Sequence, residues 1–250
     1  TREADLLFVF ATGTHRGPTP AEQERILGAE IYTRFQAQSI VHDPEDNANL
    51  IDLGTTSRGT PVRLNKRVYA CDHVITTGAV VLHYFGGYGG GRKSIVPGLA
   101  STQTIAHNHA QNLDPHEDRL NPAVRIGELD GNPVAEDMLE AARFMKVDAV
   151  VNTVLNRHGE IAGLFAGELD TAHRKAAAFA HRLYAVSIDQ PADLVVASSG
   201  TAKNFVQSHK ALFNAYQALR PGARLVLLPP TPEGIGNERF AGWLRLRTRE

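Results

Sequence analysis

Four residues of this chain could do acid–base or covalent chemistry: His15, His83, Lys93 and His109. His83 ends the apolar run VITTGAVVLH, and the following stretch FGGYGGGRKS holds five glycines and leads to Lys93. Glycine lets a backbone approach a ligand closely and turn its amides toward it, so such a loop commonly holds a phosphate or a carboxylate. Histidine titrates near neutral pH, with an unperturbed pKa of about 6.5. Two histidines beside a lysine-bearing loop therefore indicate a reactive site.

The common nucleotide-binding patterns do not match this loop. The pattern G-x-x-x-x-G-K-[ST] would need glycine at Arg92, and G-x-G-x-x-G would need its third glycine at the same position. A glycine-rich surface turn with a solvated Lys93, flanked by histidines that only stabilise strand ends, stays open as an alternative.

Length and composition bound the class of protein. The 250 residues are 42% hydrophobic, which is enough for one large or two ordinary domains. A net charge of -1 and a pI near 6.8 argue against a general nucleic-acid binder. No apolar run has transmembrane length, so we expect no membrane partner. The single Cys71 lies in an apolar context, which favours a core position and fits a reducing, cytoplasmic setting.

Strands and helices alternate along the first part of the chain. An apolar run over 6–11 stops at TGTHRGP, so His15 is expected where a strand gives way to a loop. Thr19, Pro20 and Glu22 predict a capped helix that runs to about position 35. The run 74–83 predicts a strand interrupted at 76–78. A helix start is predicted at Pro97, and a helix carrying His107 and His109 is predicted to begin near position 101.

The same alternation continues to the end of the chain. We predict a helix over 132–145, a strand over 148–155 and an alanine-rich helix over 168–184. A boundary near 189–191 precedes a second strand–helix–strand unit. The expected fold is α/β: two domains, 1–188 and 189–250, with mostly parallel sheets flanked by helices and an active site in the cleft between them. Both domains read as incomplete, as in a segment of a longer protein.

Several motifs together resemble the lactate racemase family, whose members use a nickel-pincer nucleotide. They are ATGTHR around position 15, LHYFGGYGGGRKSIVPGLAS at 82–101, NH at 108–109, GELDGNPVAEDM, and QSHKAL from position 207. The resemblance implies a racemase or epimerase of a 2-hydroxy acid, an isomerase. It also implies that Lys93 is joined through a thioamide to a pyridinium-3-thioamide-5-thiocarboxylic acid mononucleotide that holds nickel.

The resemblance also assigns roles residue by residue. It implies that His15 and His83 are the acid and base, that His109 ligates nickel, and that Gln207 and Lys210 contact the substrate carboxylate. The chain departs from the family at Val206, where tyrosine is common. The loop residues expected to bind the cofactor together with Lys93 are Gly89, Gly90, Gly91, Arg92 and Ser94.

Three histidines near the loop could ligate nickel, because imidazole is a good ligand for that metal. On one helix His107 and His109 would point about 200° apart, so only one of them can face the cofactor. His109 is chosen because its separation from Lys93 agrees with that in the family it resembles, and His116 is expected to face solvent in a polar loop. The alternative is that both helix histidines lie on the protein surface and that the cofactor alone holds the metal.

The expected partners are a small 2-hydroxy acid and the enzymes that make the cofactor, without which the protein would be unloaded. Two other functions stay open. One is a non-catalytic domain that binds a phosphorylated ligand in the glycine loop. The other is a nicotinamide-dependent hydroxy acid dehydrogenase. The missing third glycine of G-x-G-x-x-G argues against this function.

Overall fold

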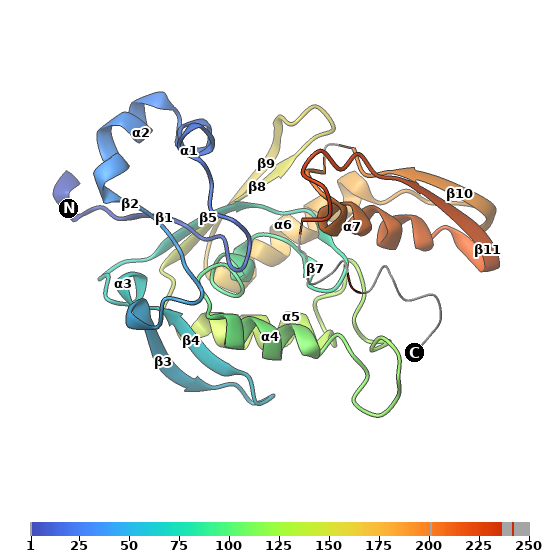
Figure 1. Cartoon of the computed structure of the whole chain (residues 1–250), viewed down its shortest axis with the longest axis horizontal. Helices are drawn as coiled ribbons and strands as arrows, with labels where there is room; N and C mark the ends of the chain where they lie inside the picture. Colours follow the sequence, from blue (N-terminus) through green and yellow to red (C-terminus); the bar gives the residue numbers. More distant parts are fainter. Residues whose placement is uncertain (1, 201, 237–241, 243–250) are drawn as a thin grey trace. The chain divides into compact units, whose positions relative to one another are not determined.

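The computed structural model describes residues 2–200, 202–236 and 242, and the chain divides into two compact units, Thr1–Tyr184 and Ala185–Glu250. The sequence-based boundary was placed a few residues later, at 188–189. Both units are α/β, with parallel and mixed sheets flanked by helices (Figure 1). No helix among the described residues is long and apolar enough to cross a membrane.

Unit 1 holds six α-helices within the described residues. They are α1 (Pro20–Leu27), α2 (Ala29–Phe35), α3 (Lys66–Tyr69), α4 (Thr102–Ala110), α5 (Pro133–Arg143) and α6 (Leu169–Tyr184). Its short 3-10 turns are η1 (Glu3–Asp5), η2 (Gln36–Gln38), η3 (Asn47–Asn49) and η4 (Gly91–Ser94).

The strands of unit 1 form four small sheets. The strands are β1 (Phe8–Phe10), β2 (Ser39–Val41), β3 (Leu50–Thr55), β4 (Pro61–Asn65), β5 (Ile75–Ala79), β6 (Leu82–His83), β7 (Gly87–Tyr88), β8 (Ala149–Leu155) and β9 (Ile161–Gly167). β1 pairs with β2 in parallel, and β5 pairs with β8 in parallel. β3–β4, β6–β7 and β8–β9 are antiparallel.

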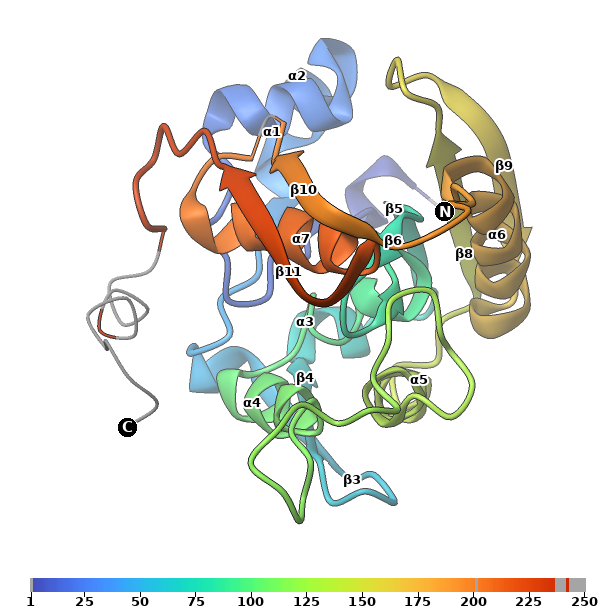
Figure 2. The ribbon, with the colours of Figure 1, turned by 90° about the vertical axis from the view of Figure 1, so that its right-hand side faces the viewer.

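Two apolar clusters form the core of unit 1. The larger one joins α4, α5 and the β3–β4 hairpin to the segment after η4, with Ile95, Val96 and Met138 fully buried. The smaller one lies where α6 packs along β8 and β9 (Figure 2). η4 contacts β5, α5 and α6, so the predicted lysine loop is held from several sides.

Local signals fixed several helix starts as predicted. Thr19 and Glu22 form the predicted capping box: the Glu22 amide donates to Thr19 Oγ1 (3.3 Å) and the Thr19 amide donates to Glu22 Oε2 (2.9 Å). Asn132 caps α5, accepting from the amide of Val134 (3.1 Å). These caps satisfy amides that have no partner inside the helix.

Four details differ from the sequence-based expectation. The helix predicted to run to position 35 breaks at Gly28, whose φ of 80° cannot continue a helix. The strand after position 74 is continuous through Gly78 and breaks only after Ala79. No helix begins at Pro97, which follows a cis peptide bond, and α4 begins at Thr102 with Ser101 as its cap. The antiparallel strand β9 was not predicted.

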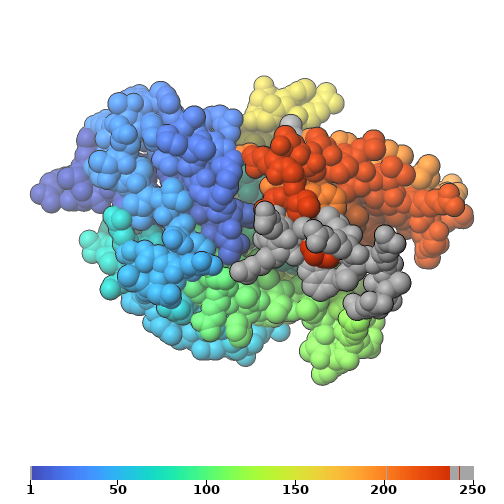
Figure 3. Space-filling model, viewed as in Figure 1, coloured from blue at the N-terminus to red at the C-terminus, as the bar shows by residue number. Residues whose placement is uncertain are grey.

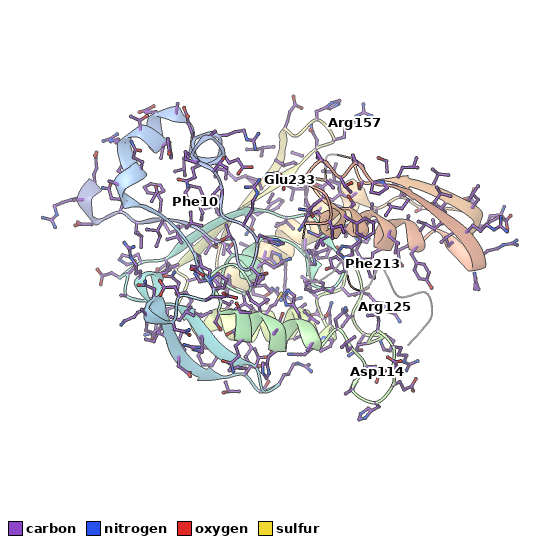
Figure 4. All side chains as sticks on the ribbon, in the orientation of Figure 1. Phe10, Asp114, Arg125, Arg157, Phe213 and Glu233 are labelled. Atoms are coloured by element: carbon purple, nitrogen blue, oxygen red, sulfur yellow. The ribbon has the colours of Figure 1, made fainter. Side chains whose placement is uncertain are left out.

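Two loops of unit 1 extend from its body. The turn between β8 and β9, in yellow, stands out from the surface (Figure 3). Arg157 lies in that turn, and Asp114 and Arg125 lie in the loop between α4 and α5 (Figure 4). That loop has its own bonds, including Arg119 Nε to Asp114 Oδ2 (3.0 Å).

Unit 2 is built from β10 (Ala192–Ser198), α7 (Phe205–Tyr216) and β11 (Leu219–Leu228). β10 and β11 are parallel, and α7 packs against both strands. Asn204 caps α7 by accepting from the amide of Gln207 (3.0 Å). This is the strand–helix–strand order that the sequence predicts.

Candidate active site

Phe85 brings three of the predicted site residues of unit 1 together. Its buried ring lies 4.5 Å from the ring of His83 and 4.6 Å from the ring of His109, centroid to centroid. Lys93 Nζ lies 5.6 Å from the same centroid. A cation over an aromatic face is attracted to it, so Phe85 stabilises the position of the ammonium group as well as both imidazoles. Sequence reasoning did not single out Phe85.

His83 is held at the start of a very tight hairpin. β6 and β7 pair Leu82 with Tyr88 and His83 with Gly87, which has a positive φ of 71°. The Gly86 amide donates to His83 Nδ1 (3.1 Å). Because an amide can only donate, Nδ1 is the acceptor, and a neutral His83 carries its proton on Nε2.

His109 faces the interior of unit 1 and His107 faces solvent, as the helical spacing predicts. Burial, Lys93 and His15 lower the pKa of His109 to about 4, named in order of their effect. The imidazole is therefore neutral near pH 7, which is the form that binds metals. His116 is exposed in the loop after α4.

His15 is exposed in the turn that follows β1. That turn is fixed to the chain after η4, because the Gly13 amide donates to Gly98 O (3.0 Å). Its second anchor is Thr12 Oγ1, which donates to His42 O (3.2 Å). The charge of His15 contributes the smallest of the three effects that lower the pKa of His109.

The glycines of the loop are required mainly by close packing. The Gly89 amide donates to Val81 O (2.8 Å), and the Gly91 amide donates to Asn152 Oδ1 (2.9 Å). Gly90 and Gly91 have φ values of 70° and 50°. The expected cradle of ligand-facing amides is therefore not formed by Gly89 and Gly91, whose amides are used inside the protein.

Arg92 lies on the opposite side of the loop from Lys93. Its guanidinium is buried and donates to Ala135 O (3.1 Å), Asp170 Oδ1 (2.6 Å) and His173 Nδ1 (3.2 Å). Burial lowers its pKa to about 10, against the opposing effect of Asp170, so it stays charged. The predicted cofactor contact of Arg92 is thus replaced by a structural role. Its partners lie too far away in the sequence to be found from local signals.

A cavity of about 770 Å³ adjoins the lysine loop within unit 1. It is lined by 6–11 around β1, by 74–79 around β5, and by Gly90, Lys93 and Ser94. Small-molecule sites commonly have volumes of about 300–1,000 Å³. The predicted loop residues Gly90, Lys93 and Ser94 therefore border a space of ligand size.

The two predicted substrate contacts of unit 2 lie next to each other on α7. Lys210 Nζ donates to Gln207 Oε1 (2.6 Å), and both side chains are half-buried. Burial lowers the pKa of Lys210. Val206 precedes this pair on the helix. An amide and an ammonium side by side can bind a carboxylate.

No group of three or more His, Cys, Asp or Glu side chains in the part of the chain that the structure describes is arranged to hold a metal ion. Lys93 and His109 both lie beside the Phe85 ring, so an amine and an imidazole could act together on one bound group.

Comparisons with known proteins identify relatives of this chain. The family model for the lactate racemase N-terminal domain matches residues 1–120. The lactate racemase of Thermoanaerobacterium thermosaccharolyticum is 32% identical over 247 residues, which cover 98% of this chain and 56% of the relative. The lactate racemase of Lactiplantibacillus plantarum is 30% identical over 242 residues, 95% of this chain and 55% of the relative. The chain thus spans about half the length of these curated relatives.

Solved structures give the same picture. The lactate racemase apoprotein from Thermoanaerobacterium thermosaccharolyticum superposes with a TM-score of 0.86 at 31% identity, covering 96% of this chain and 56% of that one. A Thermotoga maritima protein matches with a TM-score of 0.70 at 20% identity, covering 87% of this chain and 57% of that chain. At 20% identity, the second match supports a similar fold and nothing further.

Proposed function

We propose, from the premise that residues 1–120 belong to the lactate racemase N-terminal domain family and that nearly all of the chain is related to lactate racemases, that this protein inverts the hydroxyl-bearing carbon of a 2-hydroxy acid. The observation that supports the proposal most is the meeting of His83, Lys93 and His109 around Phe85. The proposed cofactor is a nickel-pincer nucleotide, attached to Lys93 and contacting His109.

The substrate explains why such a cofactor is needed. The α-hydrogen of a 2-hydroxy acid is very weakly acidic, because the neighbouring carboxylate is already negative. Departure of that hydrogen as hydride, with loss of the hydroxyl proton, leaves a planar keto acid instead. When bound, the cofactor would supply a reversible hydride acceptor.

The histidines move the hydroxyl proton in this proposal. One of His15 and His83 accepts the proton from the substrate oxygen as the α-hydrogen leaves, and the other returns a proton when hydride comes back to the opposite face. Two residues are needed because the hydroxyl group has a different position in each enantiomer, so each enantiomer needs its own acid–base group. The neutral form of His83 carries its proton on Nε2, from which it would donate a hydrogen bond to the substrate, and its protonated form would be the one that returns a proton.

The residues of α7 would bind the substrate carboxylate. Gln207 and Lys210 supply an amide and an ammonium group on one face of the helix. Val206 replaces the tyrosine that is common in the family, so the accepted substrate side chain is expected to differ from that of tyrosine-containing members. A racemisation screen over aliphatic, aromatic and sugar-derived hydroxy acids, read by chiral chromatography, identifies the substrate.

The internal use of the loop amides argues against a phosphate-binding domain. Such a domain would need the amides of Gly89 and Gly91 for its ligand, and both are bonded inside the protein. A nicotinamide dehydrogenase would need a glycine fingerprint that this chain lacks. Neither alternative accounts for a lysine and two imidazoles that share contacts with one phenylalanine ring.

Intact-mass measurement tests the proposal. The protein is produced with and without the cofactor-making enzymes, and we expect an added mass only with them. Lys93→Ala should lose the adduct and all racemisation. Lys66→Ala, at an exposed lysine of α3, should keep both. An unmodified wild-type protein after co-expression would contradict the proposal.

The acid–base pair has its own test. His15→Ala and His83→Ala should each keep the Lys93 adduct and lower the inversion rate at least about 100-fold, as expected for loss of a general acid or base. His107→Ala, at an exposed histidine, is the control. Near wild-type rates in either site variant would show that its assignment is wrong.

A further inference from the structure

Asn108 connects His109 to a buried carboxylate. The Asn108 side chain is fully buried and donates from Nδ2 to Val134 O (3.1 Å) and to Asp137 Oδ2 (2.8 Å). Its Oδ1 lies 3.1 Å from His109 Nδ1. The three side chains therefore form one line from the interior of unit 1 to the face that carries Lys93.

The direction of these hydrogen bonds can be worked out from their chemistry. A backbone carbonyl can only accept, so the end of Asn108 that faces Val134 O must be the amide nitrogen. The other end is then the carbonyl oxygen, which also only accepts. His109 Nδ1 must therefore be the donor.

Asp137 prevents Asn108 from turning around. Thr56 Oγ1 and Thr60 Oγ1 donate to its two oxygens at 2.5 and 2.9 Å, and both hydroxyls accept hydrogen bonds themselves. Asp137 is fully buried. With Asn108 Nδ2 as well, its carboxylate accepts hydrogen bonds from three donors. A flipped Asn108 would place its oxygen against two acceptors and would leave buried groups unsatisfied, which costs about 1–3 kcal/mol each.

We propose that Asn108, oriented by Asp137, is a positioning residue that holds the proton of His109 on Nδ1 and presents the lone pair of Nε2 to the site at Lys93. Within the described residues Nε2 makes no hydrogen bond. Metal-bound histidines commonly donate their second ring nitrogen in this way, and such outer partners fix the tautomer. The role of Nε2 as a nickel ligand rests on the proposed function; the tautomer does not.

Two histidines at this site then have opposite tautomers. His83 accepts at Nδ1 from the Gly86 amide and carries its proton on Nε2, whereas His109 donates from Nδ1. His83 is thereby arranged to donate a hydrogen bond from Nε2, and His109 is arranged to offer the lone pair of its Nε2. The backbone amide and the amide side chain beside them produce this difference.

Nitrogen-15 NMR of the whole, unmodified protein tests the tautomer directly. Long-range proton–nitrogen correlation spectra at pH 7 distinguish a protonated from an unprotonated ring nitrogen, and His109→Gln identifies the signals. We expect a protonated Nδ1 and an unprotonated Nε2 for His109 in the wild type. The reverse pattern would overturn the proposal, and this measurement requires no variant of Asn108 to fold.

A pair of variants tests the connection. Asn108→Ala removes the acceptor, so the signals of His109 should shift toward the Nε2-protonated form. Thr60→Val is the matched control, because it removes another hydrogen bond of Asp137 and leaves Asn108 in place. An unchanged His109 spectrum in a folded Asn108→Ala protein would show that Asn108 does not set the tautomer.

Nickel content separates this inference from the proposed function. In protein that carries the Lys93 adduct, Asn108→Ala should lower nickel affinity about 10- to 100-fold, the usual effect of losing such a partner. Unchanged affinity would overturn the positioning role. Absence of any adduct in the wild type would contradict the proposed function and leave the NMR result standing.

Discussion

The two sides of the lysine loop contain histidines with the same lowered pKa and very different surroundings. On one side His173 is fully buried, and its pKa is lowered to about 4 by burial and by Arg92. On the other side His109 has a pKa lowered to about 4 by burial, Lys93 and His15. A shifted pKa therefore does not by itself distinguish a structural histidine from a reactive one.

Hydrogen-bond partners separate the two cases. His173 uses both ring nitrogens inside the protein, because Nδ1 accepts from Arg92 (3.2 Å) and Nε2 donates to Gly89 O (2.8 Å). His109 uses Nδ1 only, toward Asn108. The neighbouring residues Arg92 and Lys93 differ in the same way, since one is committed to internal carbonyl, carboxylate and imidazole groups and the other borders the ligand-sized cavity.

Arg92→Met should give the largest loss of stability. The change leaves Ala135 O, His173 Nδ1 and Asp170 without their buried donor, so we expect the free energy of unfolding to fall by about 3–5 kcal/mol. Urea unfolding followed by circular dichroism measures it. A loss below about 1 kcal/mol would show that the buried network does not stabilise the loop.

Gly91→Ala should have the next largest effect. The new methyl group would lie 2.5 Å from the His173 ring, at a backbone φ of 50°. We expect a loss of about 2–4 kcal/mol from overpacking and backbone strain. Gly159→Ala is the control, because its φ is also positive and nothing lies within 4 Å of the new atom. Equal losses in the two variants would exclude the contact with His173.

His109 and His173 should make the free energy of unfolding depend on pH in the same way, but substituting them should have different effects on stability at pH 7. Both have folded-state pKa values of about 4, below the unfolded value of 6.5, so the unfolded chain binds more protons between these limits. The stability that these two neutral histidines contribute is therefore fully present above pH 6.5 and is lost as the pH falls toward 4. Each histidine contributes on the order of 1–3 kcal/mol to this fall.

Substitution by glutamine separates the two contributions. His109→Gln should flatten the acid limb at little cost at pH 7, whereas His173→Gln should flatten it and also destabilise the protein at pH 7. Unfolding curves between pH 4 and 8 give both quantities. An acid limb that stays as steep in both variants would contradict the assignment.

Lys93→Met should have the smallest effect on stability. The methionine side chain has a similar length and keeps the apolar contact with Phe85, so we expect a change within about 1 kcal/mol. The same protein should lose the adduct completely. A large loss of stability would show that Lys93 is structural like its neighbour Arg92.

The sequence predicts those parts of the fold that depend on short-range signals. The capping box at Thr19, the helix start at 132–133 and the apolar strand at 148–155 all depend on signals within a few residues, and each is found where expected, within one residue. Gly28 breaks a predicted helix, and β9 was missed because Gly163 and Gly167 weaken its strand pattern. Pairing with β8 stabilises that strand, and pairing is a tertiary effect.

The site shows the same division. The spacing of His107 and His109 predicts that only one of them faces inward, because both lie on one helix. The burial of Arg92 depends on Asp170 and His173, about eighty residues later. The link between Asn108 and Asp137 likewise spans two helices. No short pattern contains these contacts.

The bond between the Gly13 amide and Gly98 O makes two segments behave as one unit under mutation. Gly98 follows the lysine turn and Gly13 precedes His15, and a methyl group at either glycine would crowd the backbone of the turn at Ser94 or Pro97. A substitution at one glycine should already displace the backbone that the other glycine contacts. Substitutions at Gly13 and Gly98 should therefore be strongly non-additive, the double variant losing less than the sum of the single ones.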